Sequence, residues 1–414
     1  MKIGFVTHWF DPEGGAAAGP GTIARALRDL GHDVQVVTGF PIYPAGRVFA
    51  GYKNRPYQRE DRDGIVVHRT LIYPSHDDRA IPRVANYLSF VASGVVASTR
   101  VLRDCDVVYV YSTPATVGVI GRVLRGLRGT PYVLHIQDLW PQTVTSSGFL
   151  EGGAAGRAER VLHMMCDWIY RGAAHIAVIS PGMVDLVGQR GIPADRISVI
   201  PNWADEDAFR PDEPGPELLA EVGDRAECTV MYAGNLGEMQ HLDTLLDAAA
   251  LVSDDPRIRV LLVGGGIRAD YLRERARTEG LTNVRFLGQQ PFSRMSQVLA
   301  VGDVQLVSLK DVPLYRVTIP SKLQANMAAG RPVLGALAGD GAAAVEESGA
   351  GIVTPPGDAA ALADAMRRFA DMTEAQRNSL GQKSRAYYLA TYSQAMTAGR
   401  LDNCLRAARE VHSG

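Results

Sequence analysis

Residues 3–38, IGFVTHWFDPEGGAAAGPGTIARALRDLGHDVQVVT, decide the fold class. The stretch opens with a short apolar run, residues 3–6, and continues with a glycine-rich loop, residues 11–21. A helical pattern at 22–30 and a second β-branched run at 34–38 follow. Strand, glycine-rich loop, helix and strand in this order predict a β-α-β unit with two parallel strands.

The same alternation continues along the chain, breaks once and starts again. We expect one series of strands at 3–6, 34–38, 66–69, 107–111, 132–136 and 175–179, and a second at 229–233, 259–263, 284–287, 304–308, 333–336 and 351–353. Longer helical patterns separate these runs. Two such series predict an α/β protein with two doubly wound, Rossmann-like domains.

The break between the two series is residues 200–214, IPNWADEDAFRPDEP, which is acidic, rich in proline and without sustained periodicity. This composition is typical of an interdomain linker. We therefore expect an N-terminal domain over 1–200 and a C-terminal domain over 201–393. Open α/β sheets bind ligands beyond the carboxyl ends of their strands, so the functional site is expected in a cleft between the halves.

Composition and charge exclude several classes of protein. The hydrophobic fraction of 46% and the charged fraction of 21% are ordinary for a globular protein, so collagen and disorder do not fit. A net charge of −2 argues against a dedicated nucleic-acid binder. The front half is modestly basic and the rear half acidic. The basic half would suit binding to an anionic membrane surface or to a phosphate-bearing acceptor, but a local imbalance of charge is also common without function.

The cysteines and the N-terminus indicate a cytoplasmic protein. Cys105, Cys166, Cys228 and Cys404 lie far apart and form no C-x-x-C pair, so zinc and redox-dithiol spacings are missing. A reduced compartment fits this pattern. The chain turns polar and glycine-rich directly after Thr7, unlike a signal peptide.

The segment 84–98 is nearly free of charge but shorter than the ~20 apolar residues that a membrane span needs. Arginines follow it at 100 and 103, and more occur at 122, 125 and 128. This pattern fits shallow attachment to the inner face of the cell membrane, or a core helix with basic ends.

Gly14 and Gly15 belong to the loop between the first strand and the first helix. Glycines there let backbone N–H groups approach a phosphate beside a helix N-terminus. The spacing is not G-x-G-x-x-G, so NAD binding is not indicated, and a structural turn is the alternative.

A series of short motifs occurs in a fixed order along nearly the whole chain: LGHDV at 30–34, HIQDLWP at 135–141, IPNW at 200–203, YAGNLG at 232–237, VGGG at 263–266, FLG at 286–288, PSK at 320–322 and MAAGRPV at 327–333. In this order they resemble the retaining family 4 glycosyltransferases of the GT-B fold. The resemblance is closest to the branch that builds bacterial surface polysaccharides of the colanic acid and O-antigen type.

The resemblance implies two Rossmann-like domains facing a central cleft, with a last helix, residues 394–414, that crosses back to the N-terminal domain. The C-terminal domain of such enzymes holds a UDP- or GDP-linked sugar, and the N-terminal domain presents the acceptor. A lipid-linked glycan intermediate is the expected acceptor, at the membrane face. Three alternatives remain. The acceptor is a soluble molecule, such as a thiol; the protein is a non-catalytic partner subunit that binds a sugar nucleotide; or it is an epimerase of similar fold.

Lys322 is the expected clamp for the diphosphate leaving group, because a fixed cation there stabilises the charge that develops as the glycosidic bond breaks. The wider family often has an Arg and a Lys where this chain has Asn235 and Gln240, so Arg316 is expected to share the electrostatic role. The full set of expected donor-binding residues is Gly14, Gly15, Gly234, Asn235, Gly237, Gln240, Gly264, Gly288, Gln289, Arg316, Ser321, Lys322, Leu323 and Glu346.

A second departure from the family bears on this set: the family usually has two glutamates, separated by seven residues, that contact the ribose and the donor sugar. The family's two glutamates fall here on Val317 and Ala325, and we expect Glu346, or Glu347, to substitute for them. The base is expected beside Gln289.

For catalysis, the resemblance and the position after a strand end indicate His135 and Asp138 in acceptor positioning or proton handling, together with Lys322. We assign no covalent nucleophile, because the leaving phosphate of such enzymes is thought to take the acceptor's proton. Asp-x-Asp occurs at 61–63 and 104–106, and Asp-Glu-Asp at 205–207, in unrelated settings. No metal and no further cofactor are therefore expected, and nucleic acid is not an expected partner.

Overall fold

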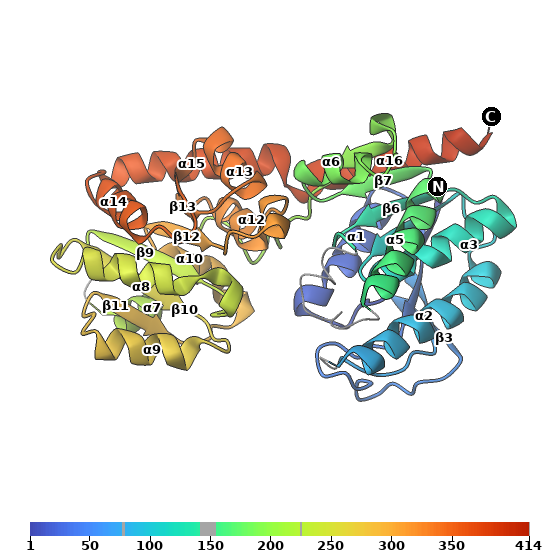
Figure 1. Cartoon of the computed structure of the whole chain (residues 1–414), viewed down its shortest axis with the longest axis horizontal. Helices are drawn as coiled ribbons and strands as arrows, with labels where there is room; N and C mark the ends of the chain where they lie inside the picture. The colour runs from blue at the N-terminus through green and yellow to red at the C-terminus, as the bar shows by residue number, and fades with distance from the viewer. Residues whose placement is uncertain (77–78, 141–154, 224–225, 414) are drawn as a thin grey trace. The chain divides into compact units, whose positions relative to one another are not determined.

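The computed structural model describes residues 1–76, 79–140, 155–223 and 226–413 (Figure 1). Its contacts divide the chain into two compact units. The N-terminal unit comprises Met1–Pro201 and Ala398–Gly414, and the C-terminal unit comprises Asn202–Thr397. The division predicted after residue 200 lies next to the first of these boundaries, and the predicted start of the returning segment, residue 394, lies a few residues before Ala398.

Within its described residues the N-terminal unit has an eight-stranded sheet in the order β3-β4-β2-β1-β5-β6-β7-β8. All neighbouring strands are parallel except β3, which runs antiparallel to β4. The strands are β1 (Lys2–Val6), β2 (Asp33–Gly39), β3 (Tyr57–Arg62), β4 (Ile65–Thr70), β5 (Val107–Ser112), β6 (Tyr132–Ile136), β7 (His175–Val178) and β8 (Ile197–Val199).

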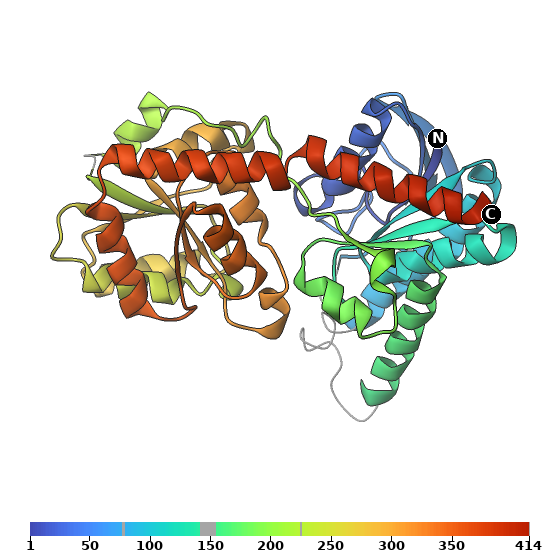
Figure 2. The same cartoon turned by 90° about the horizontal axis from the view of Figure 1, so that it is seen from above.

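Helices cover both faces of this sheet. The crossovers that contain α2, α3 and α5 all run in one direction across it, so right-handed connections place these helices in a row on one face, and α1 covers the other (Figure 2). The bounds are η1 (Gly15–Ala17), α1 (Gly19–Asp29), α2 (Ala80–Val101), η2 (Ala115–Val117), α3 (Gly118–Arg128), α5 (Ala155–Gly172), α6 (Gly182–Gly188) and η3 (Ala194–Arg196).

The last helix, α16 (Gln394–Ser413), returns to the N-terminal unit. Asp402 on this helix accepts a 2.9 Å hydrogen bond from His32 Nε2, and Arg409 pairs with Asp106. The inward side of α16 buries Leu401 and Leu405. The expected crossing helix is confirmed.

The C-terminal unit has a parallel six-stranded sheet in its described part, ordered β11-β10-β9-β12-β13-β14. Its strands are β9 (Cys228–Ala233), β10 (Ile258–Val263), β11 (Val284–Leu287), β12 (Val304–Ser308), β13 (Val333–Ala336) and β14 (Gly351–Thr354). Its helices are α7 (Pro216–Val222), η4 (Glu238–Gln240), α8 (Leu242–Leu251), α9 (Ala269–Thr278), η5 (Phe292–Arg294), α10 (Met295–Val301), α11 (Pro313–Arg316), α12 (Ser321–Ala328), α13 (Asp340–Ser348), α14 (Ala359–Ala370) and α15 (Glu374–Thr391).

Both sheets are covered on two faces, and this explains why their strands are continuous apolar runs. Val230 on β9 and Leu262 on β10 are fully buried, and the helical spacing of Leu362, Met366 and Phe369 turns one face of α14 onto the same core. Each such side chain contributes about 1.5–3 kcal/mol of burial free energy. The prediction of two Rossmann-like domains with mostly parallel sheets is confirmed.

Two strands were not predicted. β3 has the sequence YQREDR and lies at the sheet edge, where charged side chains protect exposed backbone groups, so it lacks the apolar signal of the other strands. β8 has only three residues at the opposite edge. Across the described residues, no helix combines the length and the apolar character that crossing a membrane requires.

Candidate functional site

The C-terminal sheet changes direction next to β9. From β9 the chain builds β10 and β11 on one side, and it then crosses over to build β12, β13 and β14 on the other side. Loops after β9 and β12 therefore diverge at the carboxyl edge, and this switch point is where open α/β sheets bind ligands.

Lys322 lies at this switch point. It belongs to the first turn of α12, and its Nζ is 5.5 Å from the centroid of the Tyr232 ring on β9. The side chain is half-buried, and burial lowers the pKa of its ammonium group. In the described parts of the chain no carboxylate oxygen is within 4.0 Å of Nζ, whereas most other cations of this unit have such a partner. An ammonium group held in this way suits an anionic ligand.

Two glycines make room for Lys322. Gly234 has φ +139° and Gly264 has φ +129°, a region that side-chain-bearing residues rarely adopt. A Cβ on Gly234 would collide with Cε of Lys322, and a Cβ on Gly264 would collide with the carbonyl of Gly234. The lysine thus lies against bare backbone, and the ends of β9, β10 and β11 are tied by hydrogen bonds from Gly234 N–H to Val263 and from Gly264 N–H to Leu287.

Other predicted donor residues occupy the same edge. Gln240 Oε1 accepts a 3.1 Å hydrogen bond from Gly237 N–H, so the oxygen of this side chain closes its own loop, and the expected hydrogen bond to a phosphate would come from its Nε2. Asn235 is exposed, and its backbone carbonyl accepts a 2.8 Å hydrogen bond from the Tyr232 hydroxyl. These contacts shape the loop after β9.

Gly288 and Gln289 follow β11 and are exposed, and the Gln289 side chain lies beside Gly265. Ser321 is exposed at the first position of α12. All three therefore border the edge that holds Lys322, and their donor-binding roles stay predictions.

Three predicted donor residues need correction. Arg316 forms two 2.7 Å contacts with Asp311, and this hydrogen bonding raises its pKa, so its charge is already paired. Leu323 is fully buried in the core. Glu346 lies in the last turn of α13, which leads from the carboxyl edge to the amino end of β14, so it belongs to the opposite edge of the sheet.

Gly14 and Gly15 lie in the exposed loop after β1, in the N-terminal unit, whereas the other predicted donor residues lie in the C-terminal unit. Gly15 has φ +64°. Their donor-binding role stays a prediction.

The prediction for His135 needs correction as well. This residue lies within β6, not after it, and is 1% exposed. Nδ1 is 2.6 Å from the Tyr109 hydroxyl and Nε2 is 2.9 Å from the Ile200 carbonyl. The carbonyl can only accept, so Nε2 carries the hydrogen and Nδ1 accepts from Tyr109. Neither ring nitrogen is left for a substrate, and His135 is a structural residue.

Asp138 follows β6 at the carboxyl edge of the N-terminal sheet. Its Oδ2 accepts a 3.3 Å hydrogen bond from Thr113 Oγ1, which follows β5. Burial raises the pKa of this carboxyl, and the Thr113 hydrogen bond offsets part of the effect. Asp138 therefore stays a candidate for contact with the acceptor.

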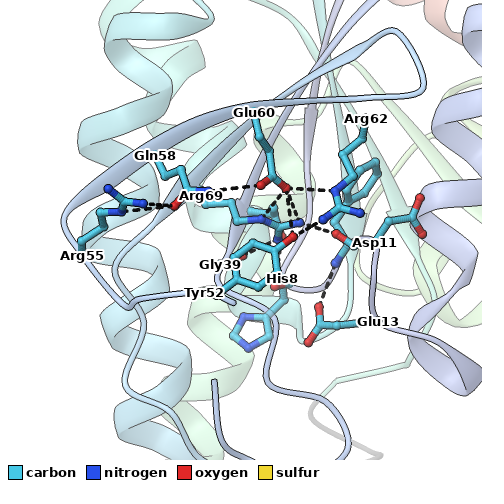
Figure 3. A network of polar contacts seen from close by, with 12 residues as sticks. His8, Asp11, Glu13, Gly39, Tyr52, Arg55, Gln58, Glu60, Arg62 and Arg69 are labelled. Atoms are coloured by element: carbon cyan, nitrogen blue, oxygen red, sulfur yellow. Dashed lines mark hydrogen bonds and ion pairs between the residues drawn. The ribbon is translucent and has the colours of Figure 1, made fainter. Parts of the chain in front are cut away.

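A buried polar network in the same unit was not predicted (Figure 3). Arg69 on β4 is 0% exposed and donates to Glu60 Oε1 at 2.8 Å, to the Gly39 carbonyl at 3.0 Å and to the Asp11 carbonyl. Glu13 accepts backbone N–H groups from Phe10, Ile42 and Tyr43. These bonds fix the loops after β1 and β2. The only signal in the sequence was Arg69, a charged residue near the end of a strand that begins with the apolar residues 65–67.

The comparisons with known proteins agree with this architecture. Residues 14–203 match the family model of the glycosyl transferase 4-like domain, and residues 227–372 match that of the glycosyl transferases group 1. The two matches cover most of both units.

Relatives and solved structures extend the likeness over the whole chain. The putative colanic acid biosynthesis glycosyl transferase WcaI of Escherichia coli is 27% identical, over 75% of this chain and 76% of its own. The probable glycosyltransferase WbjE of Pseudomonas aeruginosa is 27% identical, over 75% and 77%. Anabaena HepE, solved in complex with UDP and glucose, shares the fold with a TM-score of 0.67 and 20% identity, over 98% of this chain and 99% of its own. The chain therefore belongs to the family 4 glycosyltransferases of the GT-B fold.

Proposed function

We propose that the protein transfers a hexose, or a deoxy or amino sugar, from a UDP- or GDP-linked donor to a lipid-linked glycan intermediate in polysaccharide biosynthesis. The name of WcaI supports the pathway class, and the complex of HepE with UDP and glucose supports a nucleotide-bound donor. The transfer proceeds with retention at the inner face of the membrane, without a metal ion.

The observation that carries this proposal is the lysine at the switch point. As the glycosidic bond breaks, the diphosphate leaving group gains negative charge. The Lys322 ammonium group has no carboxylate partner among the described residues and lies over glycine backbone at the sheet edge. A preorganised cation in such a half-buried site lowers the barrier by about 3–4 kcal/mol, the size found for a single stabilising donor.

Metal independence rests on the charge of Lys322 and on the places of the acidic motifs. Those at 61–63 and 104–106 belong to the N-terminal unit, and the one at 205–207 lies before α7 and β9, at the start of the C-terminal unit. Lys322 supplies the positive charge that a divalent ion supplies in other transferases, so chelation of free metal is expected to leave turnover unchanged.

Retention rests on the family resemblance and on the same lysine. With the leaving phosphate held by Lys322, the phosphate oxygen takes the proton of the attacking hydroxyl on the face from which it departs. Asp138 then acts on the acceptor side, where its raised pKa suits a hydrogen bond to a neutral hydroxyl.

The test replaces Lys322 with glutamine and compares Lys383→Gln, an exposed lysine on α15 of the same unit. We expect Lys322→Gln to weaken UDP or GDP binding at least tenfold and to lower kcat/KM by about 10²–10³, with Lys383→Gln unchanged. Calorimetric titration and release of labelled nucleotide measure the two effects. Unaltered affinity and turnover in Lys322→Gln would refute the clamp, and nucleotide binding by the unmodified protein without sugar transfer or donor hydrolysis would refute the catalytic proposal.

A further inference from the structure

The outward side of helices α2, α3 and α5 in the N-terminal unit carries an unusual number of exposed apolar side chains. These three helices lie next to one another on one face of the sheet (Figure 1). We name this surface the α2–α5 face and define it by its exposed apolar residues, Ile81, Val84, Leu88, Ala92, Val96, Leu127, Val161, Met164 and Trp168.

Helix α2 shows the pattern most clearly. Its exposed residues Ile81, Val84, Leu88, Ala92 and Val96 recur at helical spacing along nearly the whole helix, and Ile81 is 84% exposed. A surface helix normally turns polar residues outward. Single exposed apolar residues need no explanation, but a continuous stripe indicates an interaction surface.

The charges on the same helices are mostly positive. Together α2, α3 and α5 contain eight arginines and two carboxylates, Glu159 and Asp167. Asp167 is already paired with Arg190 at 2.9 Å. Seven of the eight form no ion pair with any residue that the structure describes: Arg100, Arg122, Arg125, Arg128, Arg157, Arg160 and Arg171. The face is thus apolar and cationic at once.

A hollow of about 430 Å³ opens between α3 and α5. Arg122, Met164, Asp167, Trp168, Arg171 and Gly172 line it. The Arg122 guanidinium lies 5.0 Å from the Trp168 ring centroid, and its Nε is buried without a hydrogen-bond partner. Two arginines beside exposed Met164 and Trp168 suit a phosphate group attached to an apolar chain.

We propose that the α2–α5 face docks on an anionic lipid bilayer, with its apolar side chains at the boundary between headgroups and acyl chains and its arginines at the lipid phosphates. Charge complementarity selects this occupant, because a second copy of the chain would bring one arginine-rich face against another. The inference deepens the proposed function, since it names the surface that would bring the enzyme to a lipid-linked acceptor.

The test is sedimentation of the full chain with vesicles, without donor or acceptor. We expect binding to phosphatidylcholine vesicles that contain phosphatidylglycerol, little binding to pure phosphatidylcholine, and release at high salt. The fluorescence of Trp168 should shift to shorter wavelength on binding. Absence of sedimentation with the anionic vesicles at low salt would overturn the proposal.

Matched variants separate the face from general surface effects. Arg157→Gln with Arg160→Gln should weaken vesicle binding roughly 25-fold, at about fivefold for each arginine. Val84→Ser with Leu88→Ser should also weaken it. The controls Arg285→Gln with Arg368→Gln, and Leu251→Ser with Leu389→Ser, change exposed residues of the C-terminal unit and should bind as the unmodified chain does. Equal effects in variants and controls would contradict a lipid occupant. A dimer of the unmodified chain that Leu88→Ser dissociates would contradict it as well.

Failure of the docking proposal can be told apart from failure of the proposed transferase function. Transfer to a lipid-linked acceptor in detergent by a chain that does not bind vesicles would refute only the docking face. Vesicle binding by a chain without transferase activity would refute only the proposed function.

Discussion

The Tyr109 hydroxyl and the Ile200 carbonyl hold the ring of His135 from two sides, and burial lowers its pKa to about 4. The ring is therefore neutral in the folded protein near pH 7. In the unfolded chain the pKa is about 6.5, so the unfolded state takes up a proton first as the pH falls. The histidine thus stabilises the fold above pH 6.5, and this contribution is lost progressively toward pH 4.

We expect His135→Gln to remove this pH dependence, because glutamine can also donate to Ile200 and accept from Tyr109. From the difference between pKa values, the loss in the unmodified chain amounts to about 3 kcal/mol between pH 6.5 and 4. Urea unfolding at several pH values measures it. His8, whose pKa is also lowered to about 4 by burial, gives a parallel loss that remains in the variant. An identical pH profile for the two proteins would contradict the assignment.

Gly234 leaves the space that the Lys322 side chain occupies. Gly234→Ala places a methyl group where the Lys322 side chain lies, at a backbone φ that alanine adopts with strain. We expect a loss of stability of about 1–3 kcal/mol and at least a tenfold weaker nucleotide affinity. Gly399→Ala on α16 is the control, because a Cβ there meets nothing within 4 Å and the residue lies outside the predicted donor-binding set. Normal nucleotide affinity in Gly234→Ala would show that the lysine can move aside without cost.

At the scale of elements, the edge strand β3 is attached to its sheet by a buried charge pair. Glu60 is directed inward and meets Arg69 on β4 at 2.8 Å (Figure 3). Burial alone would raise the pKa of Glu60, but the Arg69 charge and the hydrogen bonds from Arg62 and Arg69 outweigh it, so the net pKa is lowered. The carboxylate therefore stabilises the fold above its unfolded pKa, and this contribution disappears as the pH falls below it.

Glu60→Gln should destabilise the N-terminal unit by about 3–5 kcal/mol, because it leaves the fully buried Arg69 without a counter-charge. Glu217→Gln removes the partner of Arg294 at an exposed site and should cost at most about 1 kcal/mol. Denaturant unfolding compares the two. Equal costs would mean that Tyr52, whose ring lies 5.0 Å from the Arg69 guanidinium, and the backbone carbonyls suffice to hold this arginine.

Predictability from the sequence follows the same physics. The buried parallel strands were predictable because both of their faces are apolar, whereas β3 and β8 lack that pattern. Lys322 could be found from its Pro-Ser-Lys motif. The sequence could not show that Arg316 pairs with Asp311, or that Glu346 lies in the last turn of α13. Both facts depend on the folded chain. The occupied nitrogens of His135 likewise come from Tyr109 and Ile200, which are distant in sequence.

The whole molecule consists of two units, and each has buried hydrophobic residues of its own. Leu405 on α16 is fully buried in the N-terminal unit, although it lies near the end of the chain. Lys322 belongs to the C-terminal unit. A ligand that binds one folded unit adds its binding free energy to the stability of that unit.

We therefore expect UDP or GDP to slow hydrogen exchange in β9, β10 and α12, with about 2.7 kcal/mol of added stability at a hundredfold excess over Kd. Leu405→Ala should speed exchange in β1, β2 and β5 through a loss of about 2–5 kcal/mol, and it should leave the nucleotide effect intact. Lys322→Gln should abolish the nucleotide effect and leave exchange in the N-terminal strands unchanged. Exchange mass spectrometry resolves these segments. Protection from exchange appears where the ligand stabilises the fold. If nucleotide protected β1 and the glycine-rich loop after it but not α12, the donor site would lie in the N-terminal unit and the prediction would be wrong.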